Sequence, residues 1–220
     1  RYNRVWQTGS QQRSDRNFRR ACELVLNGRI GKLHTVRCGL PGGIPDYGRT
    51  ASQTDTVPVP EGFNYDMWLG PAPWAPYNKA RCDGNFGTGG GSWRSYIDYS
   101  GGGMTDWGAH HLGGATFAVD VRELQPKEVV YHDEEHPYLT FQYPNEIQLT
   151  HHKPGKDNLE VEGDGEKREA KPIPSYKGNG GIYGDFIHCV KTREKPFRDI
   201  ELAVNTVMVA HLGIAAYALQ

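Results

Sequence analysis

Four short segments between residues 128 and 162 constrain the fold most, because each has the apolar and β-branched composition of a strand. They span residues 128–132, 138–143, 147–152 and 158–162. Turn signals divide them: Pro144-Asn145 separates the second segment from the third, and Gly163-Asp164-Gly165 follows the fourth. Such turns join antiparallel neighbours. The sequence therefore predicts a mostly antiparallel sheet.

Helical patterns flank this run of strands. A helix capped by Ser14-Asp15 and ending near Asn27-Gly28 precedes an alternating strand over residues 33–38. One helix over residues 105–119 comes before the four strands, and two over residues 183–192 and 199–218 follow them. Strands and helices grouped in this way are typical of an α+β fold. We expect an antiparallel sheet with its helices on one side.

Composition excludes several classes of protein. The 220 residues carry 25 Lys and Arg against 26 Asp and Glu, so the formal net charge is -1. This balance gives no field that attracts nucleic acid or an anionic membrane surface. No apolar run approaches the roughly 18 residues of a membrane span. The cysteines form no C-x-x-C pair and are expected to be reduced thiols; they are Cys22, Cys38, Cys82 and Cys189.

Both ends of the sequence suggest a longer protein. Residues 5–9 read as a short apolar strand, but only four residues precede it. A lone strand needs neighbours to pair its backbone groups. The final helix reaches Gln220 without a terminating glycine or proline. We expect that strands adjoining residues 5–9 belong to a part of the protein outside these residues.

The stretch Gly101–His111, GGGMTDWGAHH, carries the strongest candidate for chemistry. On a helix, Asp106 and His110 share a face, with Cβ atoms roughly 5–6 Å apart. A carboxylate beside an imidazole raises its pKa or fixes its tautomer, which suits proton transfer at an alcohol or carbonyl. The alternative is structural: Thr105 or Asp106 caps the helix, and His110 is a satisfied core residue.

Other chemistries find little support. The pairs His110-His111 and His151-His152 are poor chelates, because adjacent side chains point in different directions. No H-E-x-x-H, G-x-S-x-G or strand-linked G-x-G-x-x-G motif occurs. Asp185 and His188, three residues apart, are expected to be a helix cap and a surface or cleft residue. We expect no metal site and no nucleotide-phosphate cradle.

Five blocks, in order, resemble the Gfo/Idh/MocA oxidoreductases, the relatives of glucose–fructose oxidoreductase and inositol dehydrogenase. The blocks are VWQTGSQQRSD, YDMWLGPAPW, YSGGGMTDWGAHHL, GGIYGDFIHCVKTREKPFRDIELAV and HLGIAAYAL. The resemblance implies an NAD- or NADP-dependent oxidoreductase acting on a sugar, cyclitol or related polyol. It also implies two domains. Residues 1–12 match only the end of a Rossmann domain, and residues 13–220 match the substrate-binding and oligomerisation α+β domain.

The resemblance implies roles for particular residues. In the family's G-G-G-x-x-D-x-G-x-H block, the histidine that matches His110 is the acid/base at the reacting hydroxyl, and the aspartate that matches Asp106 supports it. The expected substrate-binding residues are Trp93, Arg94, Tyr96, His111 and Tyr183. Cofactor-binding residues stay unassigned, since the Rossmann fingerprint is not among these residues. We therefore expect the chain alone not to bind NAD or NADP and to be inactive by itself.

Two other functions stay open. One is a stand-alone carbohydrate-binding module, with a cleft lined by Tyr65, Trp68, Trp93, Arg94, Tyr96 and Tyr183. The other is a cofactor-independent glycoside lyase or hydrolase that uses Asp106 and His110. In each case the partner is a small-molecule sugar or polyol. The resemblance also implies a homo-oligomer formed through the open sheet face, and we expect a cytoplasmic protein with no membrane or nucleic-acid partner.

Overall fold

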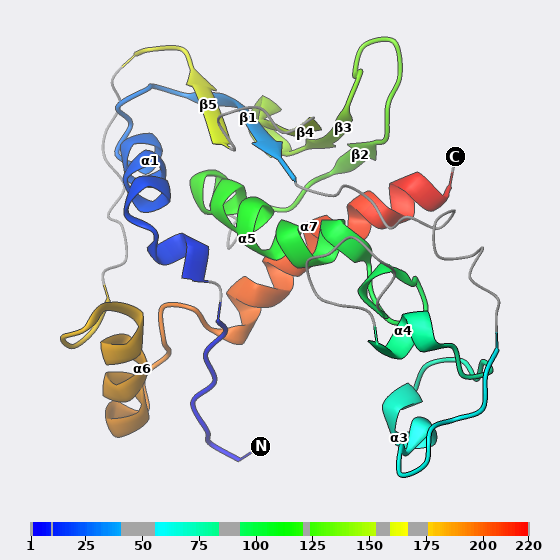
Figure 1. Cartoon of the computed structure of the whole chain (residues 1–220). Helices are drawn as coiled ribbons and strands as arrows, with labels where there is room; N and C mark the ends of the chain where they lie inside the picture. The colour runs from blue at the N-terminus through cyan, green and yellow to red at the C-terminus, as the bar shows by residue number, and fades with distance from the viewer. Residues whose placement is uncertain are drawn as a thin grey trace.

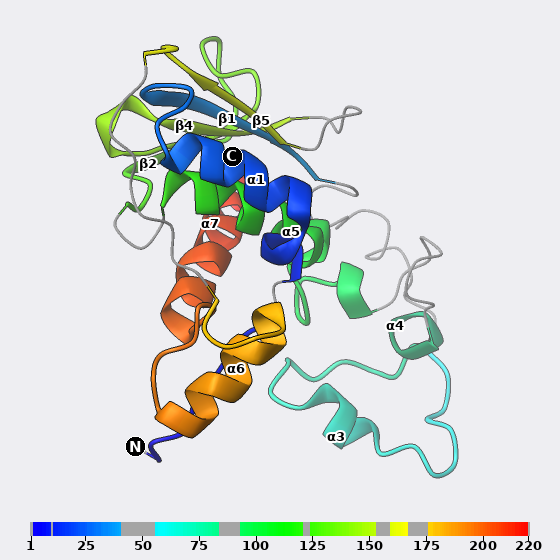
Figure 2. The ribbon, with the colours of Figure 1, turned by 90° about the vertical axis from the view of Figure 1, so that its left-hand side faces the viewer.

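A five-stranded sheet covered on one face by helices is the centre of the molecule. The computed structural model describes residues 2–9, 11–40, 56–83, 93–120, 124–152, 159–166 and 176–219. In both views the sheet lies to one side of α1, α5 and α7, whereas α3 and α6 lie farther from it (Figures 1 and 2). The expected α+β architecture, with helices on one face of an open sheet, is confirmed.

The strands and the long helices follow the order that the sequence predicts, and several short helices add to them. They are η1 (Gln11–Ser14), α1 (Arg16–Leu26), β1 (Leu33–Gly39), α3 (Tyr65–Leu69), α4 (Lys79–Asp83), η2 (Trp93–Ser95), α5 (Gly102–Val119), β2 (Glu128–Val130), β3 (Leu139–Gln142), η3 (Pro144–Glu146), β4 (Gln148–His152), β5 (Leu159–Gly163), α6 (Gly181–Thr192) and α7 (Ile200–Ala218).

The sheet has the strand order β2-β3-β4-β1-β5. Its pairs are antiparallel except one, because β1 runs parallel to β4 with Thr35 opposite Gln148. The predicted turn at Pro144-Asn145 does join the antiparallel strands β3 and β4, and Asn145 there has φ 65°. The prediction of a mostly antiparallel sheet is confirmed, with a single parallel pair at its centre.

The two faces of the sheet differ in chemistry, because successive side chains on a strand point to opposite sides. Val36, Leu149 and Phe141 face the helices and are fully buried. On the opposite face, Arg37 forms an ion pair with Glu162 and lies 3.7 Å from Glu160. The open face is therefore polar and charged rather than apolar.

Helix α5 runs under the sheet as the central helix of the core. Most of its length is buried, including Leu112, Phe117 and Val119. Glycine lets neighbouring helices come close: a Cβ on Gly114 would lie 2.8 Å from Cδ1 of Phe18, on α1. Since real Cβ contacts are almost never that short, α1 and α5 could not pack at this distance with a larger residue there.

Helix α7 packs against α5 and also has an exposed apolar side. Its buried face carries Leu202, Val209 and Ile214, while Val204 and Met208 are exposed. Among the described helices, α7 alone has the length and apolar composition of a membrane span. That finding corrects the expectation that no apolar segment reaches this length, although a core helix passes the same test.

The four cysteines are free thiols in the structure, as predicted. Burial raises the pKa of Cys22 and that of Cys38 to about 12, and it also raises the pKa of Cys189. A thiol whose pKa is raised in this way stays protonated at neutral pH and is a weak nucleophile. These three residues therefore act as small apolar side chains of the interior.

Two predictions near the ends of elements stay predictions. Residues 5–9, whose expected strand partners lie outside these residues, pair with no strand here; the Thr8 amide donates to the Arg198 carbonyl oxygen at 3.0 Å, and the Gln7 side chain donates to the Ile182 carbonyl. Gly163-Asp164-Gly165 follows β5, but residues 167–175, where a strand paired by this turn would lie, are outside the described part of the chain. The Asp164 amide there donates to the carbonyl oxygen of Lys32, which fastens the end of β5 beside the start of β1.

Candidate functional site

The first turns of α5 position the two predicted catalytic residues. The helix begins at Gly102, and its N-cap is Gly101, with no side-chain cap. Asp106 therefore lies beyond the first turn, so the capping alternative is wrong for that residue. Thr105 serves the helix start instead, because its hydroxyl accepts a hydrogen bond from the Gly101 amide at 3.1 Å. Asp106 does not cap the start of the helix.

Arg94 is the partner that the structure gives to Asp106. Arg94 Nε donates to Asp106 Oδ2, and the two side chains keep 23% and 28% of their surface exposed. No hydrogen bond joins Asp106 to His110, although both lie in the described part of α5. The carboxylate therefore does not fix the imidazole directly, as the spacing suggested. It forms, with the guanidinium, a polar pair at the surface beside the histidine.

His110 is half-buried and has one ring nitrogen inside the protein. Its Nδ1 is buried without a hydrogen-bond partner among the described residues. The ring lies 5.9 Å from that of Trp107, centroid to centroid, and Trp107 keeps 41% of its surface exposed. Nδ1 of the interior residue His111 shares this property, so it does not separate the core-histidine alternative from a functional one. The partial exposure of the His110 ring is what distinguishes it from His111.

His111 points the other way, into the interior. It is 3% exposed and lies between Phe18 and Trp107, with ring centroids 6.5 Å and 6.0 Å away. Burial lowers the pKa of His111, because a charged imidazolium loses its water there. Since adjacent residues of a helix point in different directions, the structure does not bring His111 to the face of His110.

The other predicted substrate-binding residues also differ in whether they are exposed or buried. Trp93 is 45% exposed on η2, directly before Arg94. Tyr96 is buried, and the guanidinium of Arg81 lies 5.3 Å from the centre of its ring. Tyr183 is 81% exposed on α6. The structure thus brings Arg94 to Asp106, places Trp93 next to Arg94 in the chain, and leaves Tyr96 in the interior and Tyr183 on an open helix surface.

A cavity of about 470 Å³ lies beside this group. Trp93 forms part of its wall. The other lining residues are Trp68, Leu69, Pro71, Ala72, Pro73, Asp98 and Tyr99. The volume is within the usual range for small-molecule sites, roughly 300–1,000 Å³. An aromatic wall with one carboxylate is suited to a molecule that has both apolar faces and hydroxyl groups.

A larger hollow of about 710 Å³ lies at the opposite end of α5. It is lined there by Ala118, Val119 and Asp120, together with residues of α1 and of the turn between β3 and β4. Asp106 and Ala118 are twelve residues apart on the same helix, which is about 18 Å along its axis. The hollow is therefore not part of the site around Asp106.

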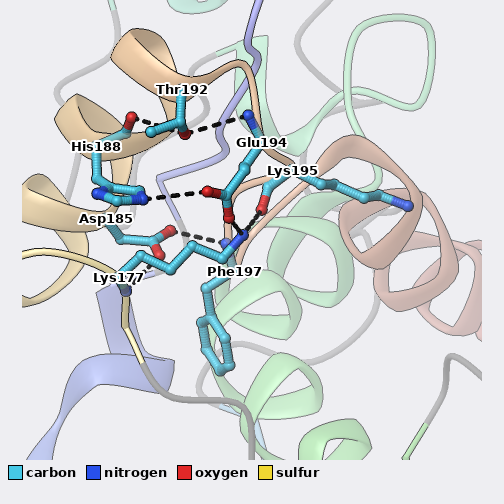
Figure 3. Close-up of polar contacts among 7 residues, drawn as sticks. All are labelled: Lys177, Asp185, His188, Thr192, Glu194, Lys195 and Phe197. Atoms are coloured by element: carbon cyan, nitrogen blue, oxygen red, sulfur yellow. Dashed lines mark hydrogen bonds and ion pairs between the residues drawn. The ribbon is translucent and has the colours of Figure 1, made fainter.

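The second aspartate–histidine pair of the sequence has a different surrounding (Figure 3). Asp185 is fully buried, and its carboxylate accepts hydrogen bonds from the Lys177 amide at 2.9 Å and the Phe197 amide at 2.7 Å. The expectation of a helix cap was wrong, since the N-cap of α6 is Gly180. Asp185 instead ties together the chain segments that enter and leave α6.

His188 lies on the surface of the same helix. Its Nε2 is 3.3 Å from Oε1 of Glu194, whose other oxygen lies 2.9 Å from Nζ of Lys177 (Figure 3). The hydrogen bond from Lys177 is the main cause that lowers the pKa of Glu194, and the contact with His188 lowers it further. These groups satisfy one another at the protein surface. None of them lines either of the two cavities described above.

The start of α5 does not fit a dinucleotide. Such a cofactor needs a glycine turn between a parallel strand and a helix, where backbone amides meet the pyrophosphate. A turn over residues 96–100, not a strand, precedes α5. A Cβ on Gly101 would lie 2.3 Å from Cδ1 of Ile214, so this glycine permits contact with α7. Within the described ranges, no group of three or more His, Cys, Asp or Glu side chains gathers to hold a metal.

Sequence reasoning missed three residues of this region. Trp107 lies between the two predicted catalytic residues, and its large exposed ring beside His110 was the available signal. Asp98 and Tyr99 line the cavity just before the glycines of α5. An Asp-Tyr pair next to a glycine run carries no recognisable pattern, so their role becomes visible only when residues 68–73 are placed opposite them.

Three solved structures match this chain at low identity and with TM-scores below 0.5. An aldose-aldose oxidoreductase from Caulobacter crescentus has a TM-score of 0.49 and 14% identity over 98% of this chain and 62% of its own. A myo-inositol 2-dehydrogenase from Lactobacillus plantarum has 0.47 and 14%, over 99% and 64%. A probable dehydrogenase from Thermotoga maritima has 0.43 and 17%, over 97% and 62%. The chain thus spans less than two thirds of the length of these relatives.

The family comparison covers more than half of the chain. Residues 45–206 match the family described as "Oxidoreductase family, C-terminal alpha/beta domain", of the Gfo/Idh/MocA type. No curated protein sequence matches. The family match includes η2, α5 and the cavity, and it agrees with the resemblance carried by the sequence blocks. The chain therefore belongs to the Gfo/Idh/MocA oxidoreductase family, through that family's C-terminal α/β domain.

Proposed function

We propose that this chain is the substrate side of an NAD(P)-dependent oxidoreductase that acts on a sugar, cyclitol or related polyol. One observation carries the proposal: the Arg94–Asp106 ion pair, the half-buried His110 imidazole and the exposed Trp107 ring lie close together on the N-terminal half of α5. They combine two charged groups, a proton-transfer group and an apolar ring. A polyol presents hydroxyls and C–H faces that match this combination.

His110 is assigned the proton transfer. Its Nδ1 is buried, so Nε2 is the ring nitrogen that faces a substrate. Neutral imidazole there accepts the proton of the reacting hydroxyl, and imidazolium returns it to a carbonyl oxygen in the reverse direction. Such positioned acid–base groups contribute about 10²–10⁴-fold to a rate.

Asp106 and Arg94 are assigned the orientation of the substrate. Asp106 Oδ2 is held by Arg94, which leaves Oδ1 to accept a hydrogen bond from a second hydroxyl. Hydrogen bonds to a charged partner contribute about 1.5–3 kcal/mol. The ion pair also limits the rotation of the carboxylate, so the accepting oxygen is already in place when the polyol arrives.

The nicotinamide cofactor supplies the hydride chemistry in such enzymes. Because the described start of α5 does not fit a dinucleotide, we assign this chain only hydroxyl binding and the proton at His110 Nε2. We expect residues 1–220 alone to bind neither NAD nor NADP more tightly than about 100 μM, or roughly 5.5 kcal/mol, and to show no dehydrogenase activity. Calorimetric titration with both cofactors, oxidised and reduced, tests this expectation.

The carbohydrate-binding alternative is favoured by the aromatic cavity beside Trp93. It differs from the main proposal in needing no proton transfer. Titration with a panel of polyols and hexoses separates the two. The main proposal requires that Asp106→Asn and His110→Ala each weaken binding about tenfold, which is 1.4 kcal/mol. The exposed His211, changed to Ala, is the matched control. Binding that is unaffected by both variants would leave only a carbohydrate-binding module.

Two further expectations belong to this proposal. Copies of the chain are proposed to associate through the open sheet face, which carries Arg37 between Glu160 and Glu162. Light scattering should show a dimer or larger assembly, and Arg37→Glu should dissociate it by placing three acids together. A cytoplasmic location is proposed as well. The free, buried cysteines support it, since reduced thiols are typical of that compartment.

A further inference from the structure

The cavity beside Trp93 has a wall that is unusually rich in aromatic surface. Trp68, Trp93 and Tyr99 line it, together with short apolar residues of the Pro71–Pro73 segment. Asp98, which is exposed, adds a carboxylate at its edge. Its volume is about 470 Å³, and neither Asp106 nor His110 lines it. The cavity is therefore separate from the residues proposed to act at the reacting carbon.

Packing fixes two of the three rings of this wall, those of Trp68 and Tyr99. Trp68 stacks on Tyr65, with ring centroids 5.8 Å apart, and meets the ring of Tyr99 edge-on at 5.3 Å. Tyr65 is itself anchored, since its hydroxyl donates to the Ala75 carbonyl at 2.9 Å. A ring already held in place loses little conformational entropy when a ligand stacks on it. The wall is thus preorganised for binding rather than assembled on contact.

The cavity and the proposed proton-transfer site share one short element. Trp93 in the cavity wall and Arg94 at Asp106 are consecutive residues of η2, so their Cα atoms are about 3.8 Å apart. Helix η2 also packs against α5. A molecule that fills the cavity and extends past Trp93 along η2 therefore extends toward the Arg94–Asp106 pair.

From these placements we infer that the cavity is a subsite for a second sugar ring. The substrate is then a glycoside or oligosaccharide, with its reacting ring at Asp106 and His110 and the adjoining ring between Trp68 and Trp93. Aromatic faces pack on the C–H faces of a pyranose, and the Asp98 carboxylate accepts hydrogen bonds from its hydroxyls. This inference rests on the proposed function, and it specifies the substrate class of that same site.

The experiment compares single rings with linked rings. Glucose, galactose and mannose, and the disaccharides cellobiose, maltose and lactose, are titrated into the full chain by calorimetry. At least one disaccharide is expected to bind about tenfold more tightly than its component monosaccharides. Trp68→Ala should remove that gain and leave monosaccharide affinity unchanged. Trp74→Ala is the matched control, because Trp74 is 76% exposed on the same segment and does not line the cavity.

Asp98→Asn provides a second variant in case Trp68→Ala disturbs the packing with Tyr65. Asp98 is exposed, so its replacement leaves the ring cluster intact, and it should reduce the disaccharide gain by at least threefold. Equal affinity for every disaccharide and its monosaccharides overturns the subsite and leaves the proposed function standing. If no sugar of the panel binds, both fail. A gain that persists in both variants also overturns the subsite.

Discussion

Two helices of this protein each carry an aspartate followed by a histidine about one turn later, and the two pairs serve different ends. On α5, Asp106 is partly exposed and its partner is the guanidinium of Arg94. On α6, Asp185 is fully buried and its partners are two backbone amides. Spacing alone does not distinguish the pairs. The partners of the carboxylate do, because Asp106 keeps an oxygen for a ligand and Asp185 does not.

The largest expected effect is the loss of stability caused by a substitution at Asp185. Asp185→Asn replaces one charged acceptor by an amide that cannot accept from both the Lys177 and Phe197 amides. Because hydrogen bonds to a buried charged group contribute about 1.5–3 kcal/mol each, the free energy of unfolding should fall by about 3 kcal/mol. Urea denaturation measures it, with Asp66→Asn on the exposed first turn of α3 as control. A loss below about 1 kcal/mol would make Asp185 no more structural than Asp106.

A smaller stability effect is expected at the α5 pair. In a double-mutant cycle of Arg94→Ala and Asp106→Ala, the coupling free energy should be about 1 kcal/mol or less, because both side chains are partly exposed and solvent screens the pair. Urea denaturation of the four proteins gives the value. Coupling above about 2 kcal/mol would mean that the ion pair holds the fold together, and would weaken the case for a ligand-binding role.

The sequence predicted the helices and strands well, but it did not predict every pairing between strands. Strands β1, β3, β4 and β5 lie within one or two residues of the predicted segments, because periodicity along a strand is a local property. The parallel pairing of β1 with β4 was not predicted. It depends on contacts between segments more than one hundred residues apart, and no local pattern records them.

At the site, too, local features were predicted and contacts between distant residues were not. The glycine run and the spacing of Asp106 and His110 were readable, whereas the pairing of Asp106 with Arg94 was not, because a turn between η2 and α5 brings them together. Asp185 was misread as a cap because a helix-start acid usually caps. Asp185 is buried where the chain comes back to it twelve residues later, at Phe197, whose amide donates to the Asp185 carboxylate.

The buried neighbour of His110 should make stability depend on pH. Burial lowers the pKa of His111 below its usual value of 6.5, so the unfolded chain binds this proton more readily than the folded one. The stabilising contribution is present above pH 6.5 and is lost as pH falls through the lower folded pKa. From pH 7 to pH 5 the urea midpoint should fall less in His111→Gln than in the original protein. An equal fall in both would assign the pH dependence to other groups.

The smallest expected effect on stability is at His188, and it tests the comparison most directly. His188→Gln removes only an exposed contact with Glu194, and exposed ion pairs contribute little. Its urea midpoint should match that of the exposed control His211→Gln, and its affinity for sugars should be unchanged. His110→Gln should be equally mild in urea but should weaken sugar binding about tenfold. Because glutamine replaces histidine in both, a shared loss of affinity, or none in either, would mean that the α5 and α6 pairs do not differ in function.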